Sequence, residues 1–169
     1  MKTFFRKILA KKKQILISIL VILVVIQFIR PEKNSGSADG PNDITQFTTV
    51  SPEVKKILEV SCYDCHSNHT VYPWYSNVQP VAWWLNDHVN EGKGEVNFSE
   101  FKSYRVKRQM RKFHEIAKQI EEEEMPLNSY LWIHGNAKLD ASQAKLLLDW
   151  AKENENLMIK MYPDSVQKG

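Results

Sequence analysis

Two cysteines and a histidine stand close together in the stretch SCYDCHSNHT, residues 61–70. Cys62 and Cys65 are separated by two residues, His66 follows directly, and the chain has no other cysteine. Two thiols at this spacing can add to the two vinyl groups of one haem, and the adjacent histidine can then reach the iron. The pattern C-x-x-C-H therefore predicts covalent attachment of a single c-type haem, with His66 as the proximal iron ligand.

Other uses of such a cysteine pair fit the sequence less well. A redox disulfide of the thioredoxin type sits at a helix N-terminus after a strand, whereas Cys62 is expected at the C-terminus of a helix. A zinc site would need four ligands within the short span from Cys62 to His69, which can hardly close a tetrahedron. A structural disulfide would close a very small loop and add little stability. A zinc or disulfide binding module is therefore the least favoured alternative.

The iron of an electron carrier usually has a second axial ligand, and Met125 is the preferred candidate. Pro126 follows it and restricts Met125 to an extended conformation, so the thioether would come from a fixed loop. His134 is the main alternative and His88 the next, since an imidazole binds iron more tightly and would lower the reduction potential.

Aromatic side chains crowd the region after the cysteine motif. A porphyrin needs flat apolar walls, and indole groups can also bond its propionates, so Trp74 and Trp83 are candidate haem contacts. Core packing explains each of them equally well when it is taken singly. As a group, these residues predict a largely buried haem.

Helical periodicity predominates after residue 50, and no stretch shows the alternation of a strand. Capping residues, prolines and glycines set the helix limits. The expected helices run from Pro52 into Cys62, from Pro80 to Gly92, from Ser99 to about Pro126 with a break, and onward from Asp140, where Gln143 completes a capping box. The predicted fold class is all-α.

The first thirty residues combine basic side chains with the apolar run ILISILVILVVIQFI at 15–29. As a helix this run is about 22 Å long, and residues 8–10 extend its surface toward the ~30 Å of a hydrocarbon core. No small-residue cleavage site follows the run closely, which favours an uncleaved anchor over a signal peptide. These features predict one transmembrane helix, in contact with the lipid bilayer through residues 8–30, that holds the remaining chain on the periplasmic side of a bacterial inner membrane.

Charge is unevenly distributed along the chain. The net charge is +3, but basic residues are concentrated in 1–30 and the remainder is mildly acidic. This distribution excludes nucleic acid as a partner, because a nucleic-acid binder carries its positive charge on the folded domain. The basic run Arg105–Lys112 is interpreted as a solvated helix face, with a docking patch for an acidic redox partner as the alternative.

Composition also suggests the domain limits. Pro31 to Val50 is rich in Gly, Ser, Asn and Asp and is predicted to be a flexible linker. The expected organisation is an anchor at 1–30, a linker at 31–50, a haem domain at 51–155 and a tail at 156–169.

Five segments extend the pattern beyond the cysteine motif. They are CYDCHSN, YPWYSNVQPVAWWLNDHV, NFSEF, EEMPLNSYLWIHGNAKLD and a closing tryptophan helix, within roughly residues 50–155. Together they resemble the bacterial haem-binding domain family, which pairs C-x-x-C-H with a Met-Pro loop and is related in outline to class I cytochromes c.

This resemblance implies a cytochrome c-like helical domain around the haem. It implies Cys62 and Cys65 as thioether attachments, His66 as proximal ligand and Met125 as distal ligand. Class I cytochromes also orient the histidine through the carbonyl of a proline, and Pro80 stands near that position.

The predicted function is a membrane-anchored, mono-haem c-type cytochrome that transfers single electrons. Its expected partners are redox proteins and the machinery that attaches haem. The alternative is a haem sensor or small peroxidase, in which Met125 leaves the iron or never binds it. His134 or His88 is then the candidate for the distal acid-base group that a peroxidase needs. An electron carrier is favoured over an enzyme, and no catalytic residue is predicted.

Overall fold

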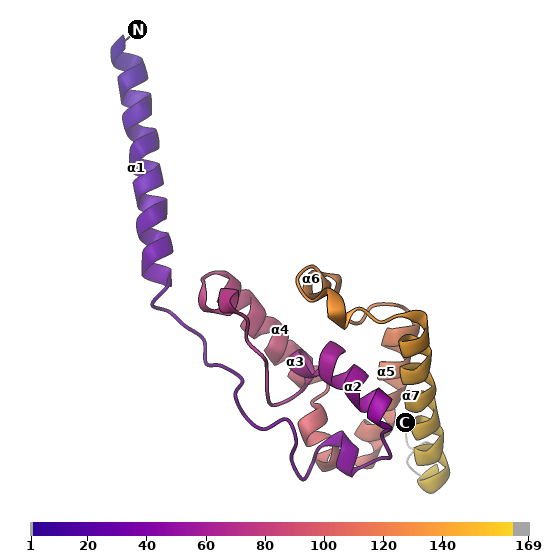
Figure 1. Ribbon diagram of the computed structural model, residues 1–169. Coiled ribbons are helices and arrows are strands. Elements are labelled where there is room, and N and C mark those ends of the chain that lie inside the picture. Colours follow the sequence, from indigo (N-terminus) through magenta and orange to yellow (C-terminus); the bar gives the residue numbers. More distant parts are fainter. Residues whose placement is uncertain (1, 164–169) are drawn as a thin grey trace. The chain divides into compact units, whose positions relative to one another are not determined.

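The computed structural model describes the backbone of residues 2–163 and the side chains of residues 11–163 (Figure 1). Its α-helices are α1 (Lys2–Ile26), α2 (Pro52–Ser61), α3 (Tyr63–His66), α4 (Val81–Glu95), α5 (Val106–Glu121), α6 (Asn128–Leu131) and α7 (Ala141–Met161). The short 3-10 helices are η1 (Ile44–Gln46), η2 (Trp74–Asn77), η3 (Phe98–Ser103) and η4 (Gly135–Ala137). Extended pairing within 2–163 is limited to an isolated bridge between Ser35 and His69. The predicted all-α class is confirmed.

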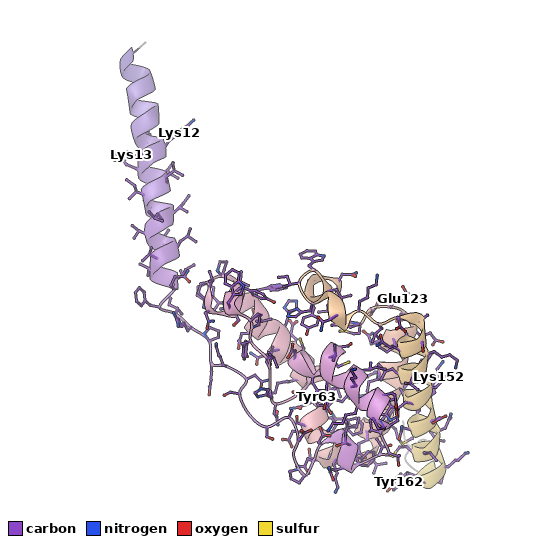
Figure 2. The ribbon with its side chains drawn as sticks, in the orientation of Figure 1. Lys12, Lys13, Tyr63, Glu123, Lys152 and Tyr162 are labelled. Atoms are coloured by element: carbon purple, nitrogen blue, oxygen red, sulfur yellow. The ribbon has the colours of Figure 1, made fainter. Side chains whose placement is uncertain are left out.

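The predicted transmembrane helix is wrong. Across the described residues, no helix combines the length and the apolar character that crossing a membrane requires. The α1 helix is long and continuous, but lysines at 11–13 interrupt its apolar sequence. Figure 2 shows Lys12 and Lys13 projecting from it. Its uncharged part, Gln14 to Ile26, measures only about 20 Å against the ~30 Å of a hydrocarbon core. The predicted anchoring in the bacterial inner membrane depended on this helix and is wrong with it.

The chain forms two compact units. One combines the residues up to Lys33 with Tyr72–His88, and the other combines Asn34–Val71 with the residues from Val89 onward. The α4 helix therefore contributes its first part to the first unit and its last part to the second. The cysteine motif and Met125 both belong to the second unit.

Hydrogen bonds, most of them partly buried, hold the first unit together after α1. The side chain of Gln27 donates to the carbonyl of Gln79 at 3.2 Å and accepts from the Gln79 amide at 2.9 Å. The carbonyl of Ile29 accepts from Gln79 Nε2 at 2.8 Å and from Trp83 Nε1 at 2.9 Å. The chain that leaves α1 is thus bonded to the start of α4.

The core of the second unit is formed partly by α5 and α7, which run side by side (Figure 1), and partly by α2, η1 and η3. Phe113 of α5 is fully buried and meets Trp150 of α7 edge-on, with ring centroids 5.6 Å apart. Burying a side chain of this size stabilises the fold by about 2–3 kcal/mol. Buried apolar side chains recur at helical spacing, as the sequence predicts. They are Phe113, Ala117 and Ile120 on α5, and Leu147, Trp150, Ala151 and Met158 on α7.

Two predicted helix starts are confirmed by their capping bonds. Ser51 Oγ accepts the Val54 amide at 3.2 Å at the start of α2, whose first residue is Pro52. Asp140 and Gln143 form a reciprocal capping box at the start of α7, with bonds of 2.8 and 3.0 Å. Each cap satisfies amides that the first helical turn leaves unpaired.

Other helix limits differ from the prediction. The third predicted helix is broken, as expected, into η3 and α5, and α5 ends at Glu121, ahead of Met125. The α4 helix continues through Gly92, the predicted stop, because this glycine keeps a helical backbone without a positive φ. In the region predicted as a tail, α7 continues to Met161, and residues 164–169 lie outside the described residues.

Residues 34–50, assigned to a linker by composition, are packed onto the second unit. Ile44 is fully buried in the core, and Asp43 is 1% exposed. Asp43 Oδ1 accepts from the amide of Thr45, and Asp43 Oδ2 accepts from the hydroxyl of Tyr63 at 3.1 Å. The segment therefore contacts the middle of the cysteine motif.

Candidate haem-binding site

The cysteine motif lies on one tight turn of backbone. Cys62 ends α2, with its amide donating to the Leu58 carbonyl at 2.9 Å, and α3 begins at the next residue. The amides of Cys65 and His66 both donate to the Cys62 carbonyl, at 3.2 and 2.9 Å. Both thiols are free and half-buried. The two sulfurs and the imidazole are thus presented by a single turn.

The His66 ring is oriented by two backbone carbonyls. Its Nδ1 lies 2.8 Å from the Gly92 carbonyl oxygen and 3.0 Å from that of Val96. Carbonyls only accept, so Nδ1 carries the hydrogen and Nε2 keeps the lone pair that a metal ion would bind. The ring also packs against Phe98 at 6.0 Å between centroids.

Burial lowers the pKa of His66, because the charged imidazolium would lose its water. The bonds to the carbonyls of Val96 and Gly92 act in the opposite direction but are the smaller effect. The imidazole is therefore held neutral, which is the form that coordinates iron.

Gly92 allows α4 to approach the motif closely. A Cβ atom at this position would lie 2.7 Å from the carbonyl oxygen of Cys65 and 3.1 Å from its Cβ. Backbone atoms cannot give way as a flexible side chain can. The bond between His66 and the Gly92 carbonyl therefore depends on a residue without a side chain.

The two thiols are weak acids in this environment. Burial, with a smaller effect of Cys65, raises the pKa of Cys62 to about 12, and burial with a smaller effect of Asp64 raises the pKa of Cys65 to about 11. A redox dithiol of the thioredoxin type has a lowered thiol pKa instead. Among residues 2–163, no three His, Cys, Asp or Glu side chains gather in a way that could hold a metal ion. The redox-disulfide and zinc alternatives therefore gain no support.

Met125 lies in the loop after α5 and packs partly against the hydrophobic core. The loop begins at Glu123, labelled in Figure 2, whose φ of 54° is left-handed. The amides of Glu124 and Met125 both lie within bonding distance of the Gln119 carbonyl, at 3.0 and 3.4 Å. The last turn of α5 thus fixes where the loop carrying Met125 starts.

A second tie joins this loop to the cysteine motif. The hydroxyl of Tyr130, on α6, donates to Asp64 Oδ2 at 2.8 Å. Asp64 stands between the two cysteines, and its Oδ1 accepts the Val71 amide at 2.9 Å. The structure therefore brings the Met-Pro segment and the cysteine motif together through Tyr130, a residue that sequence reasoning missed.

His134, the alternative distal ligand, belongs to the same segment. Its ring stacks on Tyr130, with centroids 4.1 Å apart and an interplanar angle of 14°. Its Nδ1 lies 3.2 Å from the Tyr130 carbonyl oxygen. A rearrangement of this segment would therefore move His134 together with Tyr130.

The other predicted contacts belong to the first unit. Trp74 is 79% exposed, and Trp83 donates its indole hydrogen to Ile29, as described above. His88 packs against Trp84, with ring centroids 4.3 Å apart and the planes tilted by 50°. The carbonyl of Pro80, expected to serve His66, accepts the amides of Trp83 and Trp84 at 3.1 and 3.2 Å. His66 is bonded instead to Gly92 and Val96, which no local sequence signal marks.

Two cations of α5 hold the end of α4 that orients His66. Lys112 is only 4% exposed and pairs with Glu95 at 3.2 Å and with Glu115. Arg108 donates to the carbonyl of Gly94 at 3.2 Å and stacks over the Tyr104 ring at 4.1 Å. The expectation of a wholly solvated basic face is wrong for Lys112. Positive charge at this place also complements the C-terminal end of the α4 dipole.

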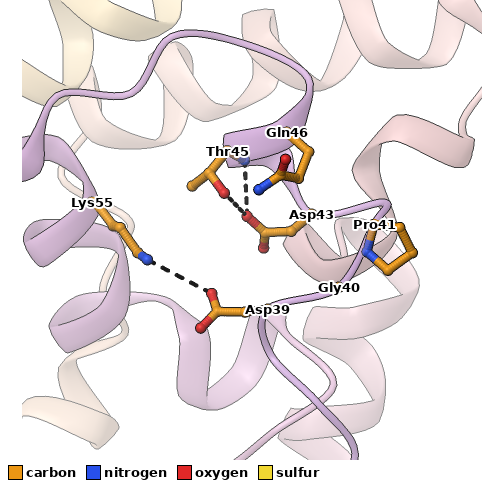
Figure 3. A pocket seen from close by; sticks show the side chains of 7 residues that line it. All are labelled: Asp39, Gly40, Pro41, Asp43, Thr45, Gln46 and Lys55. Carbon is orange, nitrogen blue, oxygen red and sulfur yellow. Dashed lines mark hydrogen bonds and ion pairs between the residues drawn. The ribbon is translucent and has the colours of Figure 1, made fainter.

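A surface pocket of about 410 Å³ is lined by residues of the segment 39–46 and by Lys55 (Figure 3). Lys55 and Asp39 form an ion pair across it at 3.8 Å, and Asp43 is already bonded to Thr45. Its lining contains none of Cys62, Cys65, His66 and Met125.

The residues of the second unit fit a haem. The turn of the cysteine motif offers two protonated thiols and a neutral imidazole with a free Nε2, and the segment tied to it carries a thioether. That segment also exposes apolar surface suited to a porphyrin: Trp132 is 83% and Ile133 65% exposed.

Comparison with known proteins agrees with this chemistry. A family model described as the haem-binding domain matches residues 21–153, which is most of the chain. No curated protein and no solved structure matches the chain. The matched range includes the cysteine motif, Met125 and the packed segment 34–50. The chain therefore belongs to the haem-binding domain family.

Proposed function

We propose that the protein is a mono-haem c-type cytochrome that carries single electrons. The observation that carries this proposal is the pair of hydrogen bonds from His66 Nδ1 to the carbonyls of Gly92 and Val96. They fix both the tautomer and the orientation of the ring, as second-shell partners of metal-bound histidines do. His66 is accordingly the proposed proximal ligand.

Cys62 and Cys65 are the proposed attachment residues. Each thiol would add across one vinyl double bond of the haem, so that sulfur would bond one carbon and the thiol hydrogen would go to the other, with no oxidant consumed. The raised pKa values of both thiols keep them protonated, and the free state of both sulfurs keeps them available. A haem-attachment machinery is the proposed partner for this step.

Met125 is the proposed distal ligand. The end of α5 and the bond between Tyr130 and Asp64 hold its loop on either side. With the Met125 thioether and the His66 imidazole as its ligands, the iron would have a raised reduction potential and no open position for a substrate. Bound haem supplies a reversible one-electron couple, so the chemistry favours an electron carrier with a redox protein as partner.

Mass spectrometry and visible spectroscopy of the full chain, expressed with a haem-attachment machinery, test this proposal. The denatured protein should carry the mass of one haem, and the reduced protein should show the sharp α and β bands of a c-type haem. Cys62→Ser and Cys65→Ser should each lose one thioether bond and shift the α band. A colourless protein with unmodified mass contradicts covalent attachment, and peroxide turnover well above that of free haem contradicts the electron-carrier assignment.

A further inference from the structure

The hydrogen bond between Tyr130 and Asp64 joins residues that are 66 positions apart in the chain. The Asp64 end is rigidly held, because its Oδ1 accepts the amide of Val71 and its backbone carbonyl accepts the Thr70 hydroxyl at 2.6 Å. Both carboxylate oxygens are therefore in use, and the acceptor offered to Tyr130 has a fixed position. A hydrogen bond to an ionised carboxylate is stronger than one between neutral groups.

Tyr130, by contrast, lies on a short element with no buried residue. The α6 helix is a single turn, and Leu127, which precedes it, provides no side-chain cap. Isolated turns of helix are unstable in water, so tertiary contacts must hold this one in place. The flanking Trp132 and Ile133 are largely exposed and supply few such contacts.

We propose that Tyr130 is a positioning residue that keeps the thioether of Met125 at the iron, by tying the distal segment to Asp64 within the turn that carries the proximal ligand. This inference rests on the proposed function. It gives Asp64, which lies between the two cysteines, a role in distal ligation that the cysteine motif itself does not require. Loss of the bond frees the segment, and His134, which stacks on Tyr130, moves with it.

Tyr130→Phe in the haem-loaded full chain tests the assignment, because it removes one hydroxyl and keeps the ring that stacks on His134. We expect the haem to remain attached and the weak red band of sulfur–iron ligation to diminish. The affinity of the reduced protein for carbon monoxide should rise by about tenfold or more. Replacement of Met125 by His134 at the iron would also support the assignment, since the sulfur band disappears in that case.

Asp64→Asn is the second variant, and it should shift both readouts in the same direction. Combining Asp64→Asn with Tyr130→Phe should change the two readouts little beyond either single variant, because both substitutions remove the same hydrogen bond. Tyr162→Phe, at an exposed tyrosine after α7, is the matched control and should match the wild type. A merely structural role would lower the unfolding temperature of Tyr130→Phe without altering the iron ligand.

The outcomes separate the two proposals. A wild-type chain without attached haem overturns the proposed function, and this assignment with it. Attached haem, with spectrum and carbon monoxide affinity unchanged in both Tyr130→Phe and Asp64→Asn, overturns the assignment alone.

Discussion

The ammonium nitrogen of Lys112 lies 3.2 Å from the carboxylate of Glu95, the last residue of the helix whose final turn orients His66. The Lys112 side chain is 6% exposed, whereas that of Glu95 is 78% exposed. The cation is thus the buried partner, and its charge is among the smaller effects that lower the pKa of His66, the proposed proximal ligand. Its charge should be felt at the iron more strongly than that of a solvated lysine.

Lys112→Met should therefore lower the reduction potential of the haem-loaded protein, because removing a nearby positive charge favours the oxidised iron. Stability should fall by only about 1 kcal/mol or less, since the exposed Glu95 and the half-exposed Glu115 regain water. Redox titration is the measurement. Lys118→Met, at an exposed lysine of the same helix, is the control and should shift the potential less. Equal shifts in the two variants would contradict a special role for the buried cation.

Gly92→Ala should destabilise the protein by about 1–3 kcal/mol, because the new Cβ would lie 2.7 Å from the Cys65 carbonyl oxygen and force backbone to move. Gly94→Ala is the matched control on the same helix, where an added Cβ meets no atom within 4 Å. It should stabilise by about 0.5–1 kcal/mol, through the better helix propensity of alanine. Urea unfolding checks both, and equal effects of the same sign would refute the close-contact argument.

The haem-free protein should lose stability as the pH falls below 6.5, the ordinary pKa of a histidine. The pKa of His66 is lowered in the fold, so below pH 6.5 the unfolded chain binds a proton that the folded chain does not, and protonation favours unfolding. Above pH 6.5 the contribution is fully present. Urea midpoints between pH 7.5 and 5 measure the slope, and His66→Gln should reduce it. An unchanged slope in that variant would assign the effect to other groups.

Alkylation of the two cysteines in the haem-free protein should be slow. At pH 8 the thiolate fraction of Cys65, with its pKa raised from 9.0 to about 11, falls roughly 100-fold, and that of Cys62, with a pKa of about 12, falls further. The rate with iodoacetamide should rise when urea unfolds the chain. A folded rate equal to the unfolded rate would show that burial does not protect the thiols.

Glu123→Gly should stabilise the protein by about 1 kcal/mol, because glycine adopts the φ of 54° without the steric cost that a side chain brings. Glu122→Gly is the control at a φ of −85°, where glycine adds only unfolded-state entropy and should destabilise. Thermal unfolding decides between them. A loss of stability in Glu123→Gly would show that the glutamate side chain contributes more than its backbone conformation costs.

Local signals in the sequence predict much of the fold. The cap at Ser51, the capping box at Asp140 and the apolar stripes of α5 and α7 each depend on residues within one or two turns, and all appear as expected. The haem-binding family follows from C-x-x-C-H for the same reason, since thiols and imidazole come from one short stretch.

Contacts between residues far apart in the sequence could not be predicted from such local signals. The carbonyls that orient His66 lie 26 and 30 residues away, and a carbonyl is present at every position, so residue type cannot mark the one that is used. Tyr130 has an ordinary tyrosine's sequence context, and only the fold shows its bond to Asp64. The membrane prediction failed because it counted residues 8–10 toward the span, on the expectation that the lysines at 11–13 would snorkel, whereas no described helix is long and apolar enough to cross a membrane.

The burial of Ile44 changes where a minimal folding piece must begin. A fragment cut at residue 50 would keep every proposed iron ligand yet lose a fully buried side chain, together with the carboxylate of Asp43 that accepts the Tyr63 hydroxyl. The bond from Asn34 to the Ser67 carbonyl, at 2.9 Å, would go as well. Expression of a shortened chain should therefore start upstream of Asn34, however dispensable its glycine- and serine-rich stretch looks in the primary structure.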